Sequence, residues 1–353
     1  MMVIDAPGLT IGIRERYRDV VSEKWPVIVT PQADELLSSW LHRLAFANGI
    51  APRPFARVLG LNAGMWSAAL DLKLPADIAT LLQAHTGISE DQLSAMSLAG
   101  SPLKPLLLPL RNNGRRDSSR WLQFCSRCLA EDAQPYFRRR WRLATKACCS
   151  KHGCGLRDRC PSCRSRVAGF DQTELVPQHH CACCGYDLRR ASIVGVGPEA
   201  KRLDRCIDDI CRLEAITGSL PSATLVRGLL GMPSVAGIYA TSSLTSLSTS
   251  TRIRCIERLA MRPSDWLTVD DDVVITHWRR LILSAGGHLP LITLLADALK
   301  RRRQQPSIAR LPPAADMSGL LGAYAGIRRS PHRRSARTHD RPGDYPVAGG
   351  KRG

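Results

Sequence analysis

The stretch ACCSKHGCGLRDRCPSC, residues 147–163, places five cysteines and one histidine within seventeen residues. Thiols this close to one another bind metal, form disulfides or act in catalysis, so their partners decide how the middle of the chain folds. The stretch contains Cys149-x2-His152 and Cys160-x2-Cys163. Pairs with this spacing offer two ligands to one zinc ion. The stretch therefore holds two half-sites, and each needs a second pair.

Matching pairs lie on both sides of this stretch. Twenty residues separate Cys125-x2-Cys128 from Cys149-x2-His152, and seventeen separate Cys160-x2-Cys163 from Cys181-x2-Cys184. These separations are typical of ribbon-like zinc sites. Four pairs give two zinc ions, one held by three cysteines and a histidine and the other by four cysteines. The predicted ligands are Cys125, Cys128, Cys149, His152, Cys160, Cys163, Cys181 and Cys184.

The pairing of these half-sites has alternatives. We expect sequential pairing, first with second and third with fourth, because each half of the module has ribbon spacing by itself. A cross-brace would instead place the first and third pairs on one ion, and an iron–sulfur cluster could use the same thiols. Cys148 competes with Cys149, Cys154 falls outside every pair, and His179 and His180 are substitutes in the second site.

Four protein ligands fill the shell of a zinc ion and leave no position for an activated water. We therefore expect two structural zinc ions per chain and no catalytic residue in the module. The chain also shows no phosphate-binding GxxxxGK[ST] loop, no nucleophile elbow and no convincing acidic triad. A non-enzymatic protein is predicted.

The positive charge is concentrated in two segments. The formal net charge is +19, and residues 111–166 carry fifteen Lys and Arg against four Asp and Glu. Residues 300–353 carry thirteen against three. Such a distribution suits a polyanion such as DNA. Within PYFRRRWRLATK, the predicted phosphate contacts are Arg138, Arg139, Arg140, Arg142 and Lys146. The alternative is that these side chains only solubilise the module.

Helical patterns flank the cysteine module. ADELLSSWLHRLAFANG (33–49) has its apolar residues on one face, with Asp34 expected to cap the helix and Gly49 to end it. Two further helices are expected after Pro75, capped by Asp77 and Ser89. They form either a helix-turn-helix or a plain helical hairpin.

The predicted fold class is mainly α with small zinc-ribbon β elements, after an irregular start. It has an N-terminal helical, helix-turn-helix-like domain, a tandem zinc-finger module, a helical C-terminal domain and a disordered basic tail. The expected boundaries are 1–105, 106–190, 191–300 and 301–353. No long apolar stretch and no signal peptide are apparent. A cytoplasmic location without membrane contact is expected, where cysteines stay reduced.

The combination of these motifs resembles the TniQ family of transposon target-selection proteins. The similar segments are DELLSSWLHRLAFANG (34–49), FCSRCLAEDAQPYFRRRWRL (124–143), CSKHGCGLRDRCPSC (149–163) and CACCGYDL (181–188). The resemblance implies zinc at the eight positions above and a helix-turn-helix in the N-terminal domain. It also implies an adaptor that marks target DNA and recruits an AAA+ ATPase and a DDE transposase.

The sequence leaves several points open. The target can be a DNA site bound directly or an RNA-guided target-bound complex, and a homodimer is compatible with the sequence. The first rival function is a zinc-containing helix-turn-helix transcription regulator. The second, disfavoured by the lack of an acidic motif, is a metal-dependent nuclease.

Overall fold

The computed structural model describes residues 2–6, 9–13, 24–52, 54–55, 69–110, 121–167, 174–216, 223–262, 265–270 and 272–304. The chain divides into two compact units, Met1–Gly287 and His288–Gly353. In the second unit the described part is helix α12 (His288–Gln304). The predicted disordered tail begins at residue 301; residues 301–304 belong to α12, and the rest of the tail lies outside the described residues.

The chain begins with a small antiparallel hairpin instead of the expected irregular segment. Strand β1 (Met2–Ala6) pairs with β2 (Leu9–Ile13), with Met2 opposite Ile13. The two strands form a two-stranded sheet. In LTIGI the apolar residues alternate with Thr10 and Gly12, which is the two-residue period of a strand, whereas MVIDA begins with three consecutive apolar residues.

The helices that follow share one apolar core. Helix α1 (Leu37–Ala47) buries Trp40, whose Nε1 donates to the Val29 carbonyl at 2.7 Å. Leu36, and not Asp34, occupies the N-cap position. Asp34 adopts a positive φ of 59° and lies outside the helix. The prediction that Asp34 caps this helix is therefore wrong, whereas the helix does end just before Gly49, as expected.

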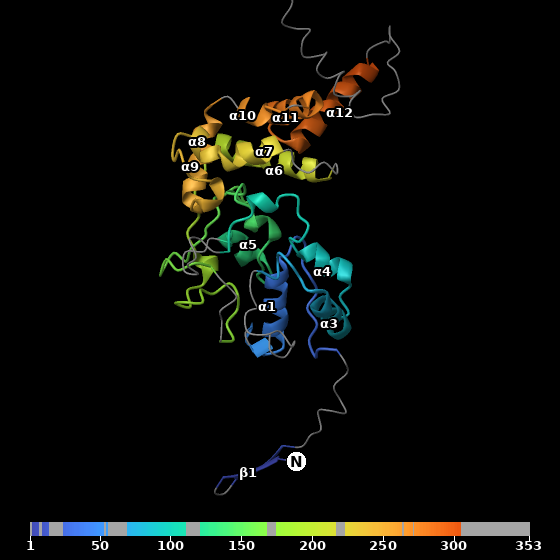
Figure 1. Ribbon diagram of the computed structural model, residues 1–353, viewed down its shortest axis with the longest axis vertical. Helices are drawn as coiled ribbons and strands as arrows, with labels where there is room; N and C mark the ends of the chain where they lie inside the picture. Colours follow the sequence, from blue (N-terminus) through green and yellow to red (C-terminus); the bar gives the residue numbers. More distant parts are fainter. Residues whose placement is uncertain are drawn as a thin grey trace, which may run out of the picture. The chain divides into compact units, whose positions relative to one another are not determined.

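The next two helices match the expected pair. Helix α3 (Ala76–Thr86) ends at Gly87, whose φ of 71° completes a left-handed C-cap. Helix α4 (Glu90–Met96) begins with a capping box formed by Ser89 and Gln92. Asp77 lies in the first turn of α3 but makes no side-chain cap, because Pro75 is the N-cap residue. Figure 1 shows α3 and α4 next to each other, and the two helices contact.

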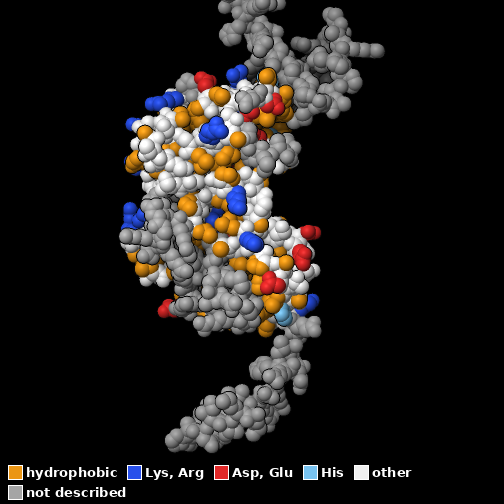
Figure 2. Space-filling model, in the orientation of Figure 1, with side chains coloured by type: hydrophobic (Ala, Val, Ile, Leu, Met, Phe, Trp, Pro, Cys, Tyr) orange, Lys and Arg blue, Asp and Glu red, His pale blue; other side chains and the backbone are white. Residues whose placement is uncertain are grey.

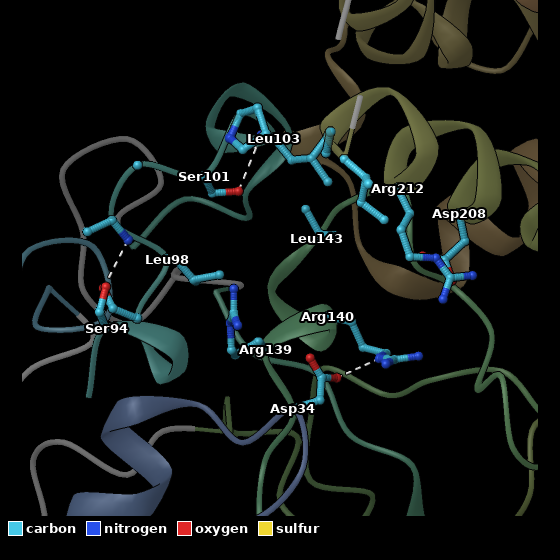
Figure 3. A pocket seen from close by; sticks show the side chains of 16 residues that line it. Asp34, Ser94, Leu98, Ser101, Leu103, Arg139, Arg140, Leu143, Asp208 and Arg212 are labelled. Carbon is cyan, nitrogen blue, oxygen red and sulfur yellow. Dashed lines mark hydrogen bonds and ion pairs between the residues drawn. The ribbon is translucent and has the colours of Figure 1, made fainter. Parts of the chain in front are cut away.

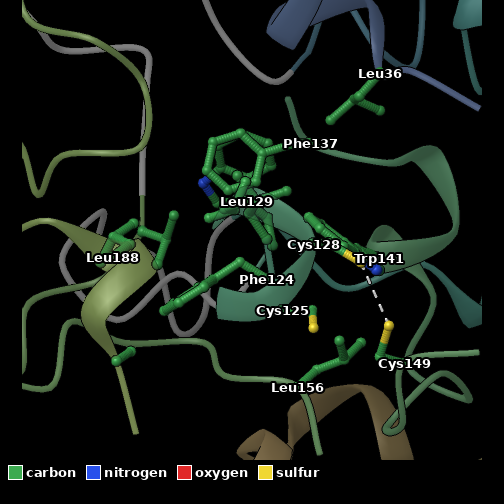
Figure 4. Close-up of a cluster of buried hydrophobic side chains, with 14 of the residues drawn as sticks. Leu36, Phe124, Cys125, Cys128, Leu129, Phe137, Trp141, Cys149, Leu156 and Leu188 are labelled. Carbon is green, nitrogen blue, oxygen red and sulfur yellow. Dashed lines mark hydrogen bonds between the residues drawn. The ribbon is translucent and has the colours of Figure 1, made fainter. Parts of the chain in front are cut away.

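In the described part of the cysteine module the regular elements are short. They are η1 (Lys104–Leu106), α5 (Ser126–Glu131), η3 (Arg139–Arg142) and η4 (Leu188–Arg190). Within its described residues the β structure consists of isolated antiparallel bridges, not of named strands. Six thiols of the module and its apolar side chains form one buried cluster (Figure 4), in which Phe124, Trp141 and Leu188 pack around Cys125 and Cys128.

Residues after the module are helical, as predicted. The helices are α6 (Pro198–Ile216), α7 (Ala223–Leu230), α8 (Met232–Val235), η5 (Leu244–Ser246), α9 (Thr249–Ala260), α10 (Asp265–Thr268) and α11 (Val273–Ala285). Helix α6 contacts both α9 and α11. Cys206, Cys211 and Cys255 are buried among these helices, as core thiols would be. No single helix in the described ranges is long and apolar enough to cross a membrane; only α11 and α12 taken together reach that length and hydropathy.

Buried polar bonds join the module to the helices that follow it. The Lys146 ammonium lies 3.0 Å from the carboxylate of Asp204 on α6, and both side chains are buried. The Gln123 side chain donates to the Lys146 carbonyl and accepts from Thr249 and Arg252 of α9. A boundary near residue 190 remains a prediction, but it is crossed by these interactions.

Candidate metal centres

Three of the four ligand pairs lie on the same kind of turn. In each, the N–H of the residue four after the first cysteine donates to that cysteine's carbonyl: Gly153 to Cys149 at 2.8 Å, Arg164 to Cys160 at 3.0 Å and Gly185 to Cys181 at 2.8 Å. These three donors all have a positive φ, of 60°, 64° and 70°. The turn thus needs a left-handed residue directly after the second ligand, where glycine costs least.

The first pair has a different support. Cys125 occupies the N-cap position of α5, and Cys128 lies in the first turn of that helix. The helix N-terminus presents backbone N–H groups and a partial positive charge, both of which favour a thiolate. One half-site is therefore helical and the other three are turns.

The first and second pairs come together in space. The Sγ atoms of Cys128 and Cys149 are 3.5 Å apart, and Nδ1 of His152 lies 3.5, 3.3 and 3.6 Å from the Sγ atoms of Cys125, Cys128 and Cys149. Bond lengths of about 2.3 Å to sulfur and about 2.0 Å to nitrogen place tetrahedral zinc ligands roughly 3.5–3.8 Å apart. The four donor atoms therefore have the spacing of a tetrahedral metal site.

His152 has the second contact that metal-binding histidines usually make. Its Nε2 lies 2.8 Å from Oε1 of Glu131, at the end of α5, while its Nδ1 faces the thiols. A carboxylate on one ring nitrogen leaves the lone pair of the other for the metal. Glu131 also pairs with Lys151 at 2.8 Å. Glu131 is not among the residues predicted from the sequence, although its place three residues after Cys128 is a signal for such a contact.

Two extra cysteines near this group have distinct places. Sγ of Cys154 lies 3.5 Å from Sγ of Cys125, so Cys154 is a fourth thiol beside the four donors of the group and not a distant bystander. Cys148 is buried outside the group, and its N–H donates to Asp204 at 3.1 Å. Burial, and then the Asp204 carboxylate, raises the pKa of Cys148 to about 12. The geometry thus favours Cys149 over Cys148 as the ligand.

The third and fourth pairs form the second group. The Sγ atoms of Cys160 and Cys184 are 3.7 Å apart and those of Cys163 and Cys181 are 3.6 Å apart. The four sulfurs all lie within 4.8 Å of one another. Cys163 is exposed, and a hydrogen bond from the Ser165 hydroxyl lowers its pKa to about 6. This group is more open to solvent than the first.

The eight predicted ligands thus form two groups of four that could each hold a metal ion. Their composition is the expected one, three cysteines with a histidine and four cysteines. The grouping corresponds to sequential pairing, since no group mixes the first pair with the third. His179 and His180 join neither group; they lie near Asp187 instead.

The predicted phosphate contacts have very different environments. The Arg142 guanidinium is fully buried, 3.0 Å from the buried Asp71 carboxylate, and lies over the Trp121 ring at 4.9 Å. Lys146 is likewise buried in its pair with Asp204. The prediction that Arg142 and Lys146 contact phosphates is therefore wrong for this structure, because both side chains hold neighbouring segments together from inside the core.

The other three arginines lie closer to the surface. Arg138 forms two hydrogen bonds with Asp132, at 2.7 and 2.9 Å, and is only 12% exposed. The Arg140 side chain is 40% exposed and donates to Asp34 at 2.5 Å, while Arg139 donates to the Ala95 carbonyl.

Arg139, Arg140 and Arg212 of α6 line a pocket of about 450 Å³ (Figure 3). On the face shown in Figure 2, the described Lys and Arg side chains are scattered and do not form a single patch. The pocket therefore brings two arginines of the module, Arg139 and Arg140, near Arg212 of α6.

A comparison with protein families identifies the segment that carries the first group. The family model TniQ matches residues 26–156. These residues form a TniQ domain. The match confirms the resemblance expected from the sequence, and it includes all four donors of the first group but ends before the second. TniQ proteins are non-catalytic adaptors associated with target selection in transposition. No curated protein matches the chain significantly.

Proposed function

We propose that this chain is a zinc-binding adaptor that selects target DNA for a transposition system and does not itself cut or join DNA. The observation that carries the proposal is the TniQ match over residues 26–156, which contains a complete Cys3His donor set. Two zinc ions, one in each group of four donors, would hold the module together. Both sets are complete, which supports a structural role for the metal.

The proposed partners are DNA, an AAA+ ATPase and a DDE transposase of the same system, in the cytoplasm. Target binding is either direct or through an RNA-guided complex, and the adaptor acts alone or as a homodimer. For direct contact we propose the helix pair α3–α4 as the helix-turn-helix, with phosphates bound by Arg138, Arg139 and Arg140. Among these, Arg139 and Arg140 face the pocket shared with α6.

A reconstituted insertion assay tests the adaptor role. With the ATPase and transposase of the same system, omission of this chain is expected to abolish insertion at the selected target while strand transfer on pre-cut ends persists. If site-selective insertion continues without the chain, the adaptor proposal fails. Cleavage of plasmid by the purified chain with Mg²⁺ or Mn²⁺ would instead support the nuclease, and repression of a neighbouring promoter would support the regulator.

A salt titration tests the binding of phosphates by these arginines. For duplex DNA, the slope of log K against log salt falls in magnitude by about 0.9 for each phosphate that the protein no longer neutralises. Arg139→Ala/Arg140→Ala is therefore expected to reduce the slope by roughly two, measured by fluorescence anisotropy. The matched control Arg127→Ala/Arg190→Ala removes the same charge from two exposed positions. Equal effects of both pairs would show that only net charge matters.

A further inference from the structure

The hairpin closed by the bridge between His180 and Asp187 carries a cluster that the two groups of four do not use. One ring nitrogen of His179, one of His180 and a carboxylate oxygen of Asp187 all lie within 4.8 Å of one another. His180 and Asp187 face each other across an antiparallel bridge, and the His179 carbonyl accepts from the Leu188 N–H at 2.9 Å. The backbone of the hairpin therefore fixes the spacing of the three side chains.

The imidazoles are arranged as ligands would be. The two ring centroids are 4.4 Å apart with planes inclined at 48°, so the rings are tilted and do not stack face to face. Nδ1 of His180 is buried and has no hydrogen-bond partner among the described residues. A buried polar atom without a partner costs free energy. A metal ion bound to Nδ1 of His180 would remove that cost.

Asp187 is already held in one orientation. Its two carboxylate oxygens accept from the Arg189 guanidinium at 2.9–3.1 Å, and Oδ1 also accepts the Arg189 N–H at 3.0 Å. Metal-binding carboxylates are commonly oriented by such hydrogen bonds. The nearby positive charge of Arg189 opposes a cation, so binding here should be weaker than at four thiolates.

We propose that His179, His180 and Asp187 form a further metal site, separate from the two cysteine groups, that takes a divalent transition-metal ion. Two imidazoles and a carboxylate suit Zn²⁺, Co²⁺ or Ni²⁺ and disfavour Mg²⁺ or Ca²⁺. Three protein ligands leave at least one position for water, unlike the cysteine groups. The ion would clamp the base of the hairpin whose tip carries Cys181 and Cys184.

Cobalt titration of the metal-free full-length chain tests this site by itself. Thiolate ligands give Co²⁺ an intense charge-transfer absorption, whereas nitrogen and oxygen ligands do not. Equilibrium dialysis counts the ions bound, and the absorption counts those on sulfur. The parent is expected to bind one equivalent that adds nothing to the thiolate absorption. The variant His179→Gln/His180→Gln should lose this additional equivalent of Co²⁺. The control His277→Gln, on α11, should still bind it.

The proposal is overturned if the parent binds no Co²⁺ beyond the ions on sulfur. It is also overturned if the double variant still binds the additional equivalent. Unchanged thiolate absorption in the double variant shows that its module is folded. A second measurement does not depend on any variant: in the ¹⁵N-labelled parent, the ring nitrogens of His179 and His180 should shift with this equivalent while those of His277 do not. If the His179 and His180 signals stay unchanged, these side chains do not bind the ion.

Discussion

Replacement of Arg142 by methionine separates a core arginine from the phosphate-binding arginine expected from the sequence. Both Arg142 and its partner Asp71 are fully buried, with Nη1 and Oδ2 3.0 Å apart. Methionine fills much of the same volume but leaves the carboxylate without its cation. The remaining donors to Asp71 are the N–H and hydroxyl of Ser38, at 2.8 and 2.9 Å. Breaking one side of a buried pair costs about 3–5 kcal/mol.

The cost should depend on pH in a recognisable direction. Burial raises the pKa of Asp71 to about 6, even though Arg142 opposes the shift. Without Arg142 the folded-state pKa should rise further, so the variant keeps its stability at acidic pH, where Asp71 is neutral, and loses it as pH rises. The destabilisation caused by Arg142→Met should therefore be smaller at about pH 5 than at about pH 8.

Urea unfolding followed by circular dichroism measures this effect at both pH values. Asp71→Asn/Arg142→Met is the matched control, because asparagine removes the charge and keeps a side-chain oxygen for Ser38. The double variant is expected to be more stable than Arg142→Met at pH 8. A loss below about 1 kcal/mol, combined with a smaller salt dependence of DNA binding, would refute the buried role and restore Arg142 as a phosphate contact.

Three further predictions concern the module and its neighbours. Cys149→Ser should lose one bound metal ion and destabilise the fold, since metal binding energy is folding energy. Cys148→Ser should keep the full metal content. Mass spectrometry under native conditions measures the metal content of both variants. Gly185→Ala should lower the free energy of unfolding by about 1 kcal/mol because its φ is positive, while Arg164→Gly should cost nothing; equal losses in denaturant titrations would contradict this. Burial lowers the pKa of His42 to about 4. As pH falls from 6.5 to 4, the free energy of unfolding of the parent should therefore decrease by up to about 3 kcal/mol more than that of His42→Gln. Parallel curves of stability against pH would contradict this.

The local pattern of the sequence was sufficient for much of the fold. The capping box of Ser89 and Gln92 and the stop at Gly87 depend on residues only a few positions apart, so the helix pair α3–α4 follows from short-range chemistry. The eight candidate metal ligands follow from spacing for the same reason, because a CxxC or CxxH pair is a property of one turn. The prediction that Asp34 and Asp77 cap their helices was wrong, because Leu36 and Pro75 occupy the N-cap positions.

Tertiary structure decided what each basic residue does. Arg138, Arg139, Arg140 and Arg142 are consecutive or nearly so, and nothing local distinguishes them. Only the approach of Asp71, some seventy residues earlier, buries Arg142 in an ion pair, while Arg140 meets Asp34 at the surface. The third cluster likewise requires a hairpin to bring Asp187 to His179 and His180. Ligand spacing is encoded along the chain, but burial and charge pairing depend on which distant segment packs against it.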